Sequence, residues 1–461
     1  MTKLPPEIFK AYDIRGIVGK TLTPEIVEQI GRGLGSMALE RDRDTIAIGC
    51  DGRLSGPSLK AALAKGIQSA GANVVDIGFV TTPLTYYAAH HLGTGCSVMV
   101  TGSHNPPDYN GLKMVIAGET LSGPDIQTLR QRVIDGDLRS GNGTLSQDSV
   151  VEAYIERVVG DVRLSRPMKI AVDCGNGIAG AIAPQLFRRL GCDVLELFCD
   201  VDGHFPNHHP DPSQPANLRD LIRTVRNSDC ELGLAFDGDG DRLGVVTKSG
   251  AIIYPDRQLM LYAADVLSRN PGATIIYDVK STRNLRGWIE SHGGKPLMWK
   301  TGHSLVKAKM KETGAALAGE MSGHTFFGER WYGFDDGLYC GARLLEILSR
   351  HDDPGRVLES LPDSLSTPEL QVPCVEGEAH ALIARMQTEA KFPGAEQIVR
   401  IDGLRVEYPD GFGLARASNT TPVIVLRFEA DDQPALDRIQ CDILAAIKAI
   451  KPDATIATSG H

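Results

Sequence analysis

The chain has 461 residues, of which 42% are hydrophobic and 23% are charged, a composition typical of soluble globular proteins. Its net charge of −10 disfavours nucleic acid or an anionic membrane as a partner, so an anionic ligand needs local cations and backbone N–H groups. The nine cysteines show no C-x-x-C spacing, which indicates neither a thiolate zinc site nor a disulfide framework. Because no basic and apolar leader opens the chain and no run of about 18 apolar residues occurs, we expect a cytoplasmic protein without a membrane span.

The length predicts about three domains of roughly 150 residues, and the chain contains a loose threefold repeat of strand, helix and strand. The three units cover residues 45–77, 170–197 and 274–299. The predicted helices cover 57–70, the stretch up to 190, and about 282–292, and they are followed by Gly71, Gly191 and Gly293. Short apolar runs that alternate with glycine-terminated helices predict parallel βαβ units.

A further apolar strand follows each unit, and each of these strands ends in an unusual polar loop. The predicted strands are 98–100, 232–236 and 315–318, and their loops read TGSHNP (101–106), DGDGDR (237–242) and GEMSGH (319–324). In open parallel sheets, ligands bind beyond the carboxyl ends of the strands. Three equivalent strand ends with three different chemistries therefore predict one cleft that is assembled from three domains.

Polar and proline-containing stretches divide the chain. The first linker is expected at residues 136–146, the second boundary near Gly250, and the third within 349–373. Beyond it, a strand at 423–428 and a closing helix at about 435–450 indicate a small α+β domain. We therefore expect domains at 1–149, 150–250, 251–364 and 365–461. The predicted fold is three related α/β domains with mixed, largely parallel sheets and a smaller α+β C-terminal domain, arranged around one central cleft.

The loop 237–242 is the most informative segment of the chain. Its three carboxylates are separated only by glycines, so the backbone can fold tightly and bring them to one point. Three anions about 4 Å apart repel by roughly 4 kcal/mol per pair at an effective dielectric near 20, so the cluster needs a cation. Oxygen donors suit Mg²⁺ before Mn²⁺ or Ca²⁺. An EF-hand requires Gly and Glu where Arg242 and Lys248 stand, and the flanking apolar strands disfavour a solvated acidic turn.

The other loops leave alternatives open when each is taken alone. Ser103 is expected to be exposed, as a nucleophile, a phosphate ligand or a plain loop serine, and activation by a metal suits it better than the G-x-S-x-G elbow of hydrolases. The loop 319–324 suits hydrogen bonds to ligand hydroxyls or forms a satisfied polar turn. The loop 416–422 (RASNTTP) suits a phosphate or a carboxylate, or is an ordinary turn with a surface arginine.

Together, these four loops resemble those of the α-D-phosphohexomutase family, in its phosphomannomutase/phosphoglucomutase branch. The segment 101–106 is similar to the family's phosphoserine loop and 237–242 to its magnesium loop. The segments 319–324 and 416–422 are similar to its sugar loop and its phosphate loop. Segments 11–16 (AYDIRG) and 110–113 (NGLK) also resemble family segments, and the similarity runs in order along essentially the whole chain.

The resemblance implies a heart-shaped monomer in which the fourth domain closes on the substrate, and it implies residue roles. Ser103 would carry the phosphoryl group and would hold one Mg²⁺ with Asp237, Asp239 and Asp241. The residues around the reacting phosphoryl group would be Arg15, His104, Lys113, Arg242 and His324. Substrate binding would involve Tyr12, Lys280, Gly302, His303, Glu320, Ser322, Arg416, Ser418, Asn419 and Thr420, with Glu320 and Ser322 on the 3- and 4-hydroxyls. Taken singly, Arg15, Lys113, Lys280 and His303 would be assigned to solvated surface.

The implied reaction is reversible phosphoryl transfer between the 1- and 6-positions of hexose phosphates of mannose and/or glucose. A hexose 1,6-bisphosphate would be both the intermediate and the activator. Two alternatives stay open: a phosphoglucosamine mutase, against which Met321 argues because that branch usually has Gln there, and a non-catalytic sugar-phosphate sensor. Ser103 beside three aspartates disfavours the sensor.

Overall fold

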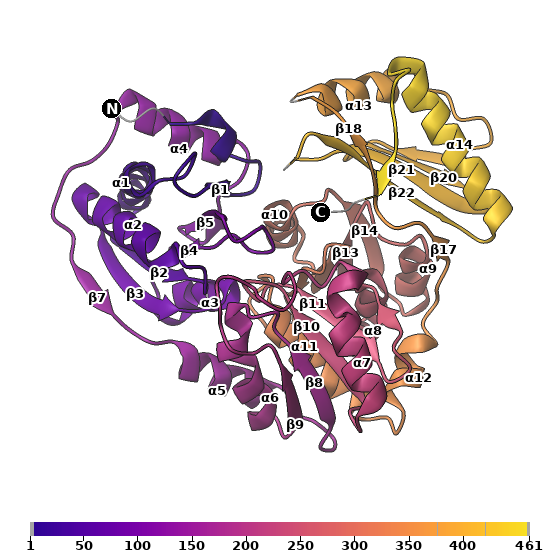
Figure 1. Ribbon diagram of the computed structural model, residues 1–461, viewed down its shortest axis with the longest axis horizontal. Helices are drawn as coiled ribbons and strands as arrows, with labels where there is room; N and C mark the ends of the chain where they lie inside the picture. Colours follow the sequence, from indigo (N-terminus) through magenta and orange to yellow (C-terminus); the bar gives the residue numbers. More distant parts are fainter. Residues whose placement is uncertain (1–3, 376, 420, 459–461) are drawn as a thin grey trace.

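The computed structural model describes residues 4–375, 377–419 and 421–458 and contains four sheets that follow one another along the chain (Figure 1). Figure 1 shows three α/β units in succession and, at the other side of the molecule, a last unit formed by the C-terminal residues. The predicted fold class, three related α/β domains and a smaller α+β domain, is confirmed. Within the described residues, none of the helices combines the length and the apolar content needed to cross a membrane.

The first sheet has the order β1-β5-β4-β2-β3-β7, with β6 beside β5. Its strands are β1 (Ile14–Ile17), β2 (Thr45–Cys50), β3 (Asn73–Phe79), β4 (Ser97–Val100), β5 (Tyr109–Ile116), β6 (Glu119–Thr120) and β7 (Leu145–Gln147). Its helices are α1 (Pro24–Glu40), α2 (Gly56–Ala70), α3 (Thr82–His91) and α4 (Pro124–Asp135). The expected linker 136–146 overlaps at its end with β7, which pairs in parallel with β3.

The second sheet has the order β12-β11-β10-β8-β9. Its strands are β8 (Lys169–Asp173), β9 (Asp193–Leu197), β10 (Leu232–Phe236), β11 (Leu243–Thr247) and β12 (Ile252–Ile253), with helices α5 (Val151–Asp161), α6 (Ala183–Arg189) and α7 (Arg219–Asn227). All five residues of β10 are buried, as are those of β11. Because β10 is parallel to β8 but antiparallel to β11, the loop 237–242 is a hairpin turn at the carboxyl end of a parallel strand.

The third sheet has the order β14-β13-β15-β16. Its strands are β13 (Thr274–Asp278), β14 (Lys295–Trp299), β15 (Leu317–Gly319) and β16 (Thr325–Phe327), and its helices are α8 (Pro255–Arg269), α9 (Asn284–Ser291), α10 (His303–Thr313), α11 (Gly337–Leu348) and α12 (Pro354–Glu359). The strand predicted from 315 starts at Leu317, and the helix predicted from 282 starts at Asn284. Thr282 precedes the helix, and its side-chain hydroxyl accepts a hydrogen bond from the Asn284 N–H at 3.2 Å, at the start of α9.

The fourth sheet is antiparallel, with the order β19-β20-β21-β22-β18-β23 and with β17 beside β22. Its strands are β17 (Leu365–Ser366), β18 (Leu370–Pro373), β19 (Gln397–Val399), β20 (Leu404–Tyr408), β21 (Gly411–Ala417), β22 (Val423–Ala430) and β23 (Ala457–Thr458). Helices α13 (Glu378–Glu389) and α14 (Gln433–Ile450) pack against it, and their buried residues form a separate apolar core with the sheet. The predicted strand and closing helix of this domain are both present.

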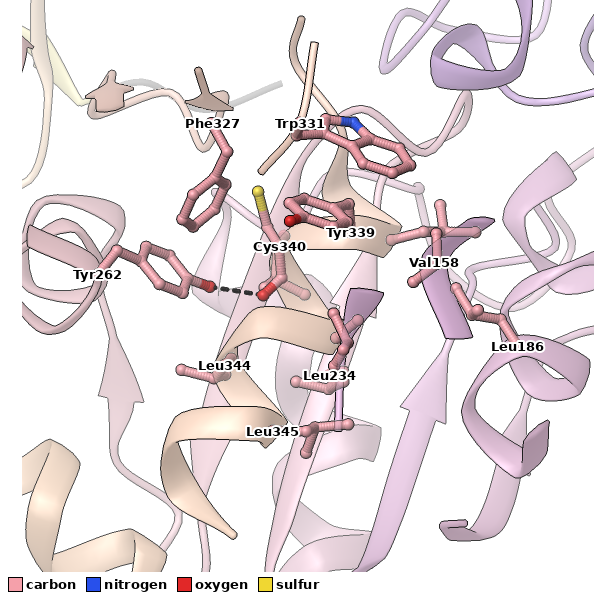
Figure 2. Packing of buried hydrophobic residues seen from close by; sticks show 14 of the residues in the cluster. Val158, Leu186, Leu234, Tyr262, Phe327, Trp331, Tyr339, Cys340, Leu344 and Leu345 are labelled. Atoms are coloured by element: carbon pink, nitrogen blue, oxygen red, sulfur yellow. Dashed lines mark hydrogen bonds between the residues drawn. The ribbon is translucent and has the colours of Figure 1, made fainter. Parts of the chain in front are cut away.

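The second and third sheets share one hydrophobic core (Figure 2). In Figure 2, Leu344, Leu345 and Tyr339 of α11 lie between side chains from both units, and the Tyr262 hydroxyl donates to the Cys340 carbonyl oxygen at 2.9 Å. By contrast, the fourth unit meets the third through a small apolar cluster, Val279 with Phe412 and Leu414. The middle of the molecule is therefore a continuous scaffold, and the fourth unit is attached to it by a smaller apolar contact.

Candidate active site

Ser103 lies on the loop between β4 and β5, called here the serine loop (101–106). It adopts a left-handed backbone conformation with φ of 49°. The prediction that this serine is exposed is wrong, because only 1% of its surface is accessible. The backbone of the aspartate loop (237–242) covers it: a Cβ on Gly238 would lie 2.4 Å from the Ser103 carbonyl oxygen. The two strand ends therefore touch, and a glycine is required at the contact.

A buried ion pair between Arg53 and Asp51 holds the backbone of the serine loop in place. The Arg53 guanidinium donates to the carbonyl oxygens of Ser103 at 2.7 Å and of Asn105 at 2.6 Å. Its Nε lies 3.3 Å from Asp51 Oδ2, which also accepts from the Thr101 hydroxyl at 2.7 Å. Sequence reasoning missed this role, although the run DGR follows the first strand of the repeat at the same edge of the sheet.

The three aspartates of the aspartate loop are fully buried, and one carboxylate oxygen of each lies within 4.8 Å of the others. Asp237 Oδ1 accepts from the backbone N–H of Asp241 at 3.1 Å and of Arg242 at 3.2 Å, so the loop closes around its first carboxylate. The Ser103 hydroxyl donates to Asp237 Oδ2 at 3.0 Å. The structure thus brings the serine and the three aspartates together from two units of the fold.

Lys113 of β5 is the cation that donates hydrogen bonds to this cluster in the described structure, and Arg242 Nε lies 3.9 Å from Asp237 Oδ2. Lys113 is 4% exposed, and its ammonium group donates to Asp239 Oδ2 at 2.7 Å and to Asp241 Oδ2. Burial lowers the pKa of Lys113, but the two carboxylates outweigh burial and raise that pKa well above its ordinary value. Burial and the charges of Asp241 and Asp239 raise the pKa of Asp237. One ammonium group therefore only partly offsets three carboxylates.

The remaining oxygens of the cluster fit a metal ion. The Oδ1 atoms of Asp239 and Asp241 are buried and have no hydrogen-bond partner among the residues that the structure describes, although Asp241 Oδ1 lies 3.5 Å from His324 Nε2. Unpaired carboxylate oxygens are unfavourable away from water unless a cation binds them. A set of carboxylate oxygens beside a serine hydroxyl is the donor chemistry that a hard divalent ion prefers. The residues present therefore fit such an ion.

The loop 319–324 adjoins the aspartate loop. Glu320 is buried, and its Oε1 accepts from the Gly302 N–H, while Oε2 lies 3.4 Å from His324 Nδ1. The Ser322 hydroxyl lies 2.8 Å from the same His324 nitrogen. Arg242 Nε donates to His324 Nε2 at 3.3 Å, and a β-bridge joins the backbones of Arg242 and His324. The second and third strand ends are therefore connected directly.

Sequence reasoning missed Asp335, which is buried beside His324, and its partner Lys307, which is partly buried. Asp335 Oδ1 accepts from the Lys307 ammonium group at 2.8 Å, and Oδ2 lies 4.0 Å from His324 Nε2 and 3.7 Å from His303 Nδ1. Burial and Lys307 lower the pKa of His303. Burial and Arg242 also act to lower the pKa of His324, but Asp241 and Glu320 raise it above its ordinary value. The only local signal for Asp335 was the acidic pair before α11.

His104 and Arg15 lie beside the serine. His104 Nδ1 is 3.2 Å from the Ser103 hydroxyl oxygen, and burial together with Arg242 and Arg15 lowers the pKa of His104 well below its ordinary value. Arg15 donates to Asn105 Oδ1 of the serine loop and to Asp13 Oδ2, both at 2.5 Å. His104 is therefore a neutral imidazole in contact with the hydroxyl, and Arg15 adds a positive charge nearby.

The loop 416–422 reaches the first unit through Tyr12. The Asn419 side-chain amide donates to the Tyr12 hydroxyl, which in turn donates to the Thr301 carbonyl oxygen at 2.8 Å. Burial raises the pKa of Tyr12 to about 12, so the hydroxyl keeps its proton. The Ser418 hydroxyl lies 3.0 Å from that of Thr421. The predicted ligand Thr420 lies outside the described residues.

Lys280 lies on the third unit and contacts the fourth. Its ammonium group donates to Glu369 Oε2 at 3.2 Å. Lys280 lowers the pKa of Glu369 despite burial, and Arg416 lowers it further. Lys280 of the third unit and Arg416 of the fourth therefore both lower the pKa of the Glu369 carboxyl.

The fold and the site define the class: an α/β protein of four successive units whose strand-end loops place a buried serine against three aspartates. Comparison with known families identifies that class. Residues 6–139, 152–250 and 254–365 match the phosphoglucomutase/phosphomannomutase alpha/beta/alpha domains I, II and III. Residues 369–446 match the phosphoglucomutase/phosphomannomutase C-terminal domain. The chain belongs to the phosphoglucomutase/phosphomannomutase family.

Individual relatives agree with this assignment. The chain is 58% identical to "Phosphoglucomutase" of Neisseria gonorrhoeae, over 97% of this chain and 98% of the relative. It is 56% identical to "Phosphomannomutase/phosphoglucomutase" of Pseudomonas aeruginosa strain PAO1, over 97% and 96%. Among solved structures, a phosphoglucomutase/phosphomannomutase family protein from Burkholderia thailandensis superimposes with a TM-score of 0.94 at 58% identity, covering 98% of this chain and all of that one.

Proposed function

We propose that the protein interconverts hexose 1-phosphates and hexose 6-phosphates of glucose and mannose by phosphoryl transfer through Ser103. The observation that carries this proposal is the buried Ser103 hydroxyl, 3.0 Å from Asp237 in a cluster of three aspartates. Family membership, and relatives named as phosphoglucomutase and phosphomannomutase, support the same reaction.

The proposed metal is one Mg²⁺ per chain, held by Asp237, Asp239 and Asp241 together with the Ser103 oxygen. Bound there, it would supply charge neutralisation for a phosphoryl group on the serine. Lys113 donates to Asp239 and Asp241, which are two of the proposed metal ligands, so its ammonium group would add a second positive charge beside the metal.

The side chains around the serine do most of the positioning. Arg15, Lys113 and Arg242 surround the hydroxyl with positive charge, which stabilises a phosphoryl group during transfer. His104 Nδ1 lies 3.2 Å from the Ser103 hydroxyl oxygen, and because its pKa is well below the ordinary value it adds no positive charge to that of Arg15, Lys113 and Arg242. His324 lies between Asp241 and Glu320, which raise its pKa, and it is the group proposed to exchange a proton with the attacking or leaving sugar hydroxyl.

The rest of the substrate is assigned to the third and fourth units. Glu320 and Ser322 would bind the 3- and 4-hydroxyls of the sugar, since Glu320 Oε2 is buried without a hydrogen-bond partner in the described part of the chain. The non-reacting phosphate would be held by residues of the loops described above, namely Tyr12, Lys280, Gly302, His303, Arg416, Ser418, Asn419 and Thr420. The protein would act as a cytoplasmic monomer.

In the proposed reaction, the Ser103 oxygen–phosphorus bond breaks as the free sugar hydroxyl forms a bond to the same phosphorus. The product is a hexose 1,6-bisphosphate. The bisphosphate then binds in the reverse orientation and returns its other phosphate to Ser103, which restores the phosphoserine. The same bisphosphate would activate any enzyme whose serine carries no phosphate.

A coupled assay tests the proposal. Purified protein with Mg²⁺ and a trace of glucose 1,6-bisphosphate should convert glucose 1-phosphate to glucose 6-phosphate, detected as NADPH formed by glucose-6-phosphate dehydrogenase. The Ser103→Ala variant provides the matched control. Absence of turnover by the native protein, or equal turnover by the variant, would refute the proposed reaction.

A further inference from the structure

Asp402, in the turn between β19 and β20, is not among the residues assigned above to any step. Its Oδ2 accepts from Arg416 Nε at 3.1 Å and from the backbone N–H of Thr301 at 3.0 Å. The side chain of Asp402 is 15% exposed and that of Arg416 is 6% exposed. One carboxylate oxygen therefore joins the guanidinium of the fourth unit to the backbone of the third.

The turn that carries Asp402 is packed directly against Arg416. Gly403 has φ of 80°, and a Cβ there would lie 2.6 Å from the Arg416 Cβ. Both the conformation and the spacing require glycine at this position. The Gly403 carbonyl oxygen accepts from the Gln387 side chain of α13 at 2.6 Å. Asp402 is consequently fixed in relation to the arginine that it contacts.

Thr301 is the point at which three units of the fold meet. Its carbonyl oxygen accepts from the Tyr12 hydroxyl of the first unit at 2.8 Å. Its own hydroxyl donates to Asp278 of the third unit at 3.0 Å, and its N–H donates to Asp402 of the fourth. Because Asn419 donates to Tyr12, the loop 416–422 reaches this point by two routes.

The residue after Thr301 extends the connection to the loop assigned to the sugar. The Gly302 N–H donates to Glu320 Oε1. Gly302 has φ of 133°, and a Cβ there would lie 2.5 Å from the Tyr12 ring, so this backbone fits only as glycine. A short path of three contacts therefore runs from Arg416 through Asp402 and the 301–302 backbone to Glu320.

We propose that Asp402 is a positioning residue for phosphate recognition, which orients Arg416 and docks the loop 416–422 on Thr301. The inference rests on the proposed function and names a further residue of that site. A carboxylate near a bound phosphate repels it, so Asp402 can favour binding only through geometry. By binding Nε, it leaves the two terminal amino groups of the guanidinium in the plane suited to bidentate contact with a phosphate.

The test compares Asp402→Ala and Asp402→Asn with the native protein in the glucose 1-phosphate assay. Because misplaced binding groups cost one to two orders of magnitude, Asp402→Ala should raise KM about tenfold or more while kcat falls by less than about threefold. Asp402→Asn keeps an acceptor oxygen and should recover most of the native KM. Calorimetric titration of glucose 1-phosphate into the dephosphorylated proteins, without bisphosphate, should give Kd values that rank the native protein and the two variants in the same order as their KM values.

Asp410→Ala provides the matched control. Asp410 also lies in the fourth unit, pairs with Arg438 at 2.5 Å and is 41% exposed, but it has no contact with Arg416 or Thr301 in the described structure. Its KM should equal that of the native protein. Thermal unfolding of each variant is measured in parallel, and Asp402→Ser, with the same expected rise in KM, replaces Asp402→Ala if the latter does not fold.

Three results would overturn the positioning role. A native KM in Asp402→Ala contradicts it, and tighter binding would show that the carboxylate competes with phosphate. A KM for Asp402→Asn as high as that for Asp402→Ala would show that the charge of Asp402 matters and that its acceptor geometry does not. An inactive native protein in the same assay would instead refute the proposed function, so the two failures are distinguishable.

Discussion

Replacing Lys113 with Met should destabilise the metal-free protein more than any single surface substitution, and Mg²⁺ should recover much of the loss. Methionine keeps the volume of the buried stem but removes the ammonium group that contacts Asp239 and Asp241. With that charge absent, three buried carboxylates face one another without a contacting cation from β5.

The magnitude follows from the geometry of the ion pair. At the 2.7 Å that separates Lys113 Nζ from Asp239 Oδ2, the gross attraction is about 6 kcal/mol at an effective dielectric near 20. Desolvation offsets part of it, and breaking one side of a buried pair typically costs about 3–5 kcal/mol. At roughly 2–4 °C per kcal/mol, the Tm in EDTA should fall by about 10 °C.

The assay is thermal unfolding followed by intrinsic fluorescence, in EDTA and in saturating Mg²⁺. Because a bound cation replaces the lost charge, Mg²⁺ should raise the Tm of Lys113→Met by more than that of the native protein. Lys65→Met is the control, since Lys65 pairs with Glu28 at 2.9 Å on the surface, where such pairs contribute about 1 kcal/mol or less. Equal Tm values for the two variants in EDTA, or equal Mg²⁺ shifts, would refute the reasoning.

Three further outcomes are expected. EDTA should abolish turnover, and Mg²⁺ should restore it. Asp239→Asn should need a higher Mg²⁺ concentration for half-maximal rate, because one of three anionic ligands is lost. Full activity in metal-free buffer would contradict the metal assignment. Dephosphorylated protein should show a lag that a trace of glucose 1,6-bisphosphate removes, whereas immediate turnover without it would exclude a phosphoserine donor. Since the sugar contacts are assigned to O3 and O4, kcat/KM for glucose 1-phosphate and mannose 1-phosphate should agree within roughly tenfold, and a thousandfold preference would show that another residue binds O2.

The sequence predicted the parts of the site that carry a local signal. The alternation of apolar runs and glycine-terminated helices placed three polar loops at strand ends, and the hairpin 237–242 joins two buried strands. The glycines between the aspartates predicted convergence, and the structure brings those carboxylates within 4.8 Å. These features depend on neighbours in the chain, which a sequence displays directly.

Burial and long-range contacts could not be predicted in the same way. Ser103 was expected to be exposed because nothing near it in the chain shows that Gly238, from another unit, covers it. Lys113 taken singly was assigned to solvated surface, yet its partners are more than 120 residues away in the chain. Asp335 shows only the acidic pair before α11 and Asp402 shows no distinctive pattern, and the contacts with Lys307 and with the Thr301 backbone span 28 and 101 residues of the chain.

The measurement that tests the central claim most directly is peptide mass spectrometry of the protein after incubation with glucose 1,6-bisphosphate and Mg²⁺. The account predicts one phosphoryl group on Ser103. It also predicts that this group is replaced by the phosphoryl group of the substrate when glucose 1-phosphate with an isotopically labelled phosphate is then added in excess to protein freed of bisphosphate. It also predicts no phosphorylated peptide and no turnover for Ser103→Ala. A native protein that isomerises glucose 1-phosphate while Ser103 stays unmodified, or a phosphoryl group on another residue that turns over at the catalytic rate, would contradict the account.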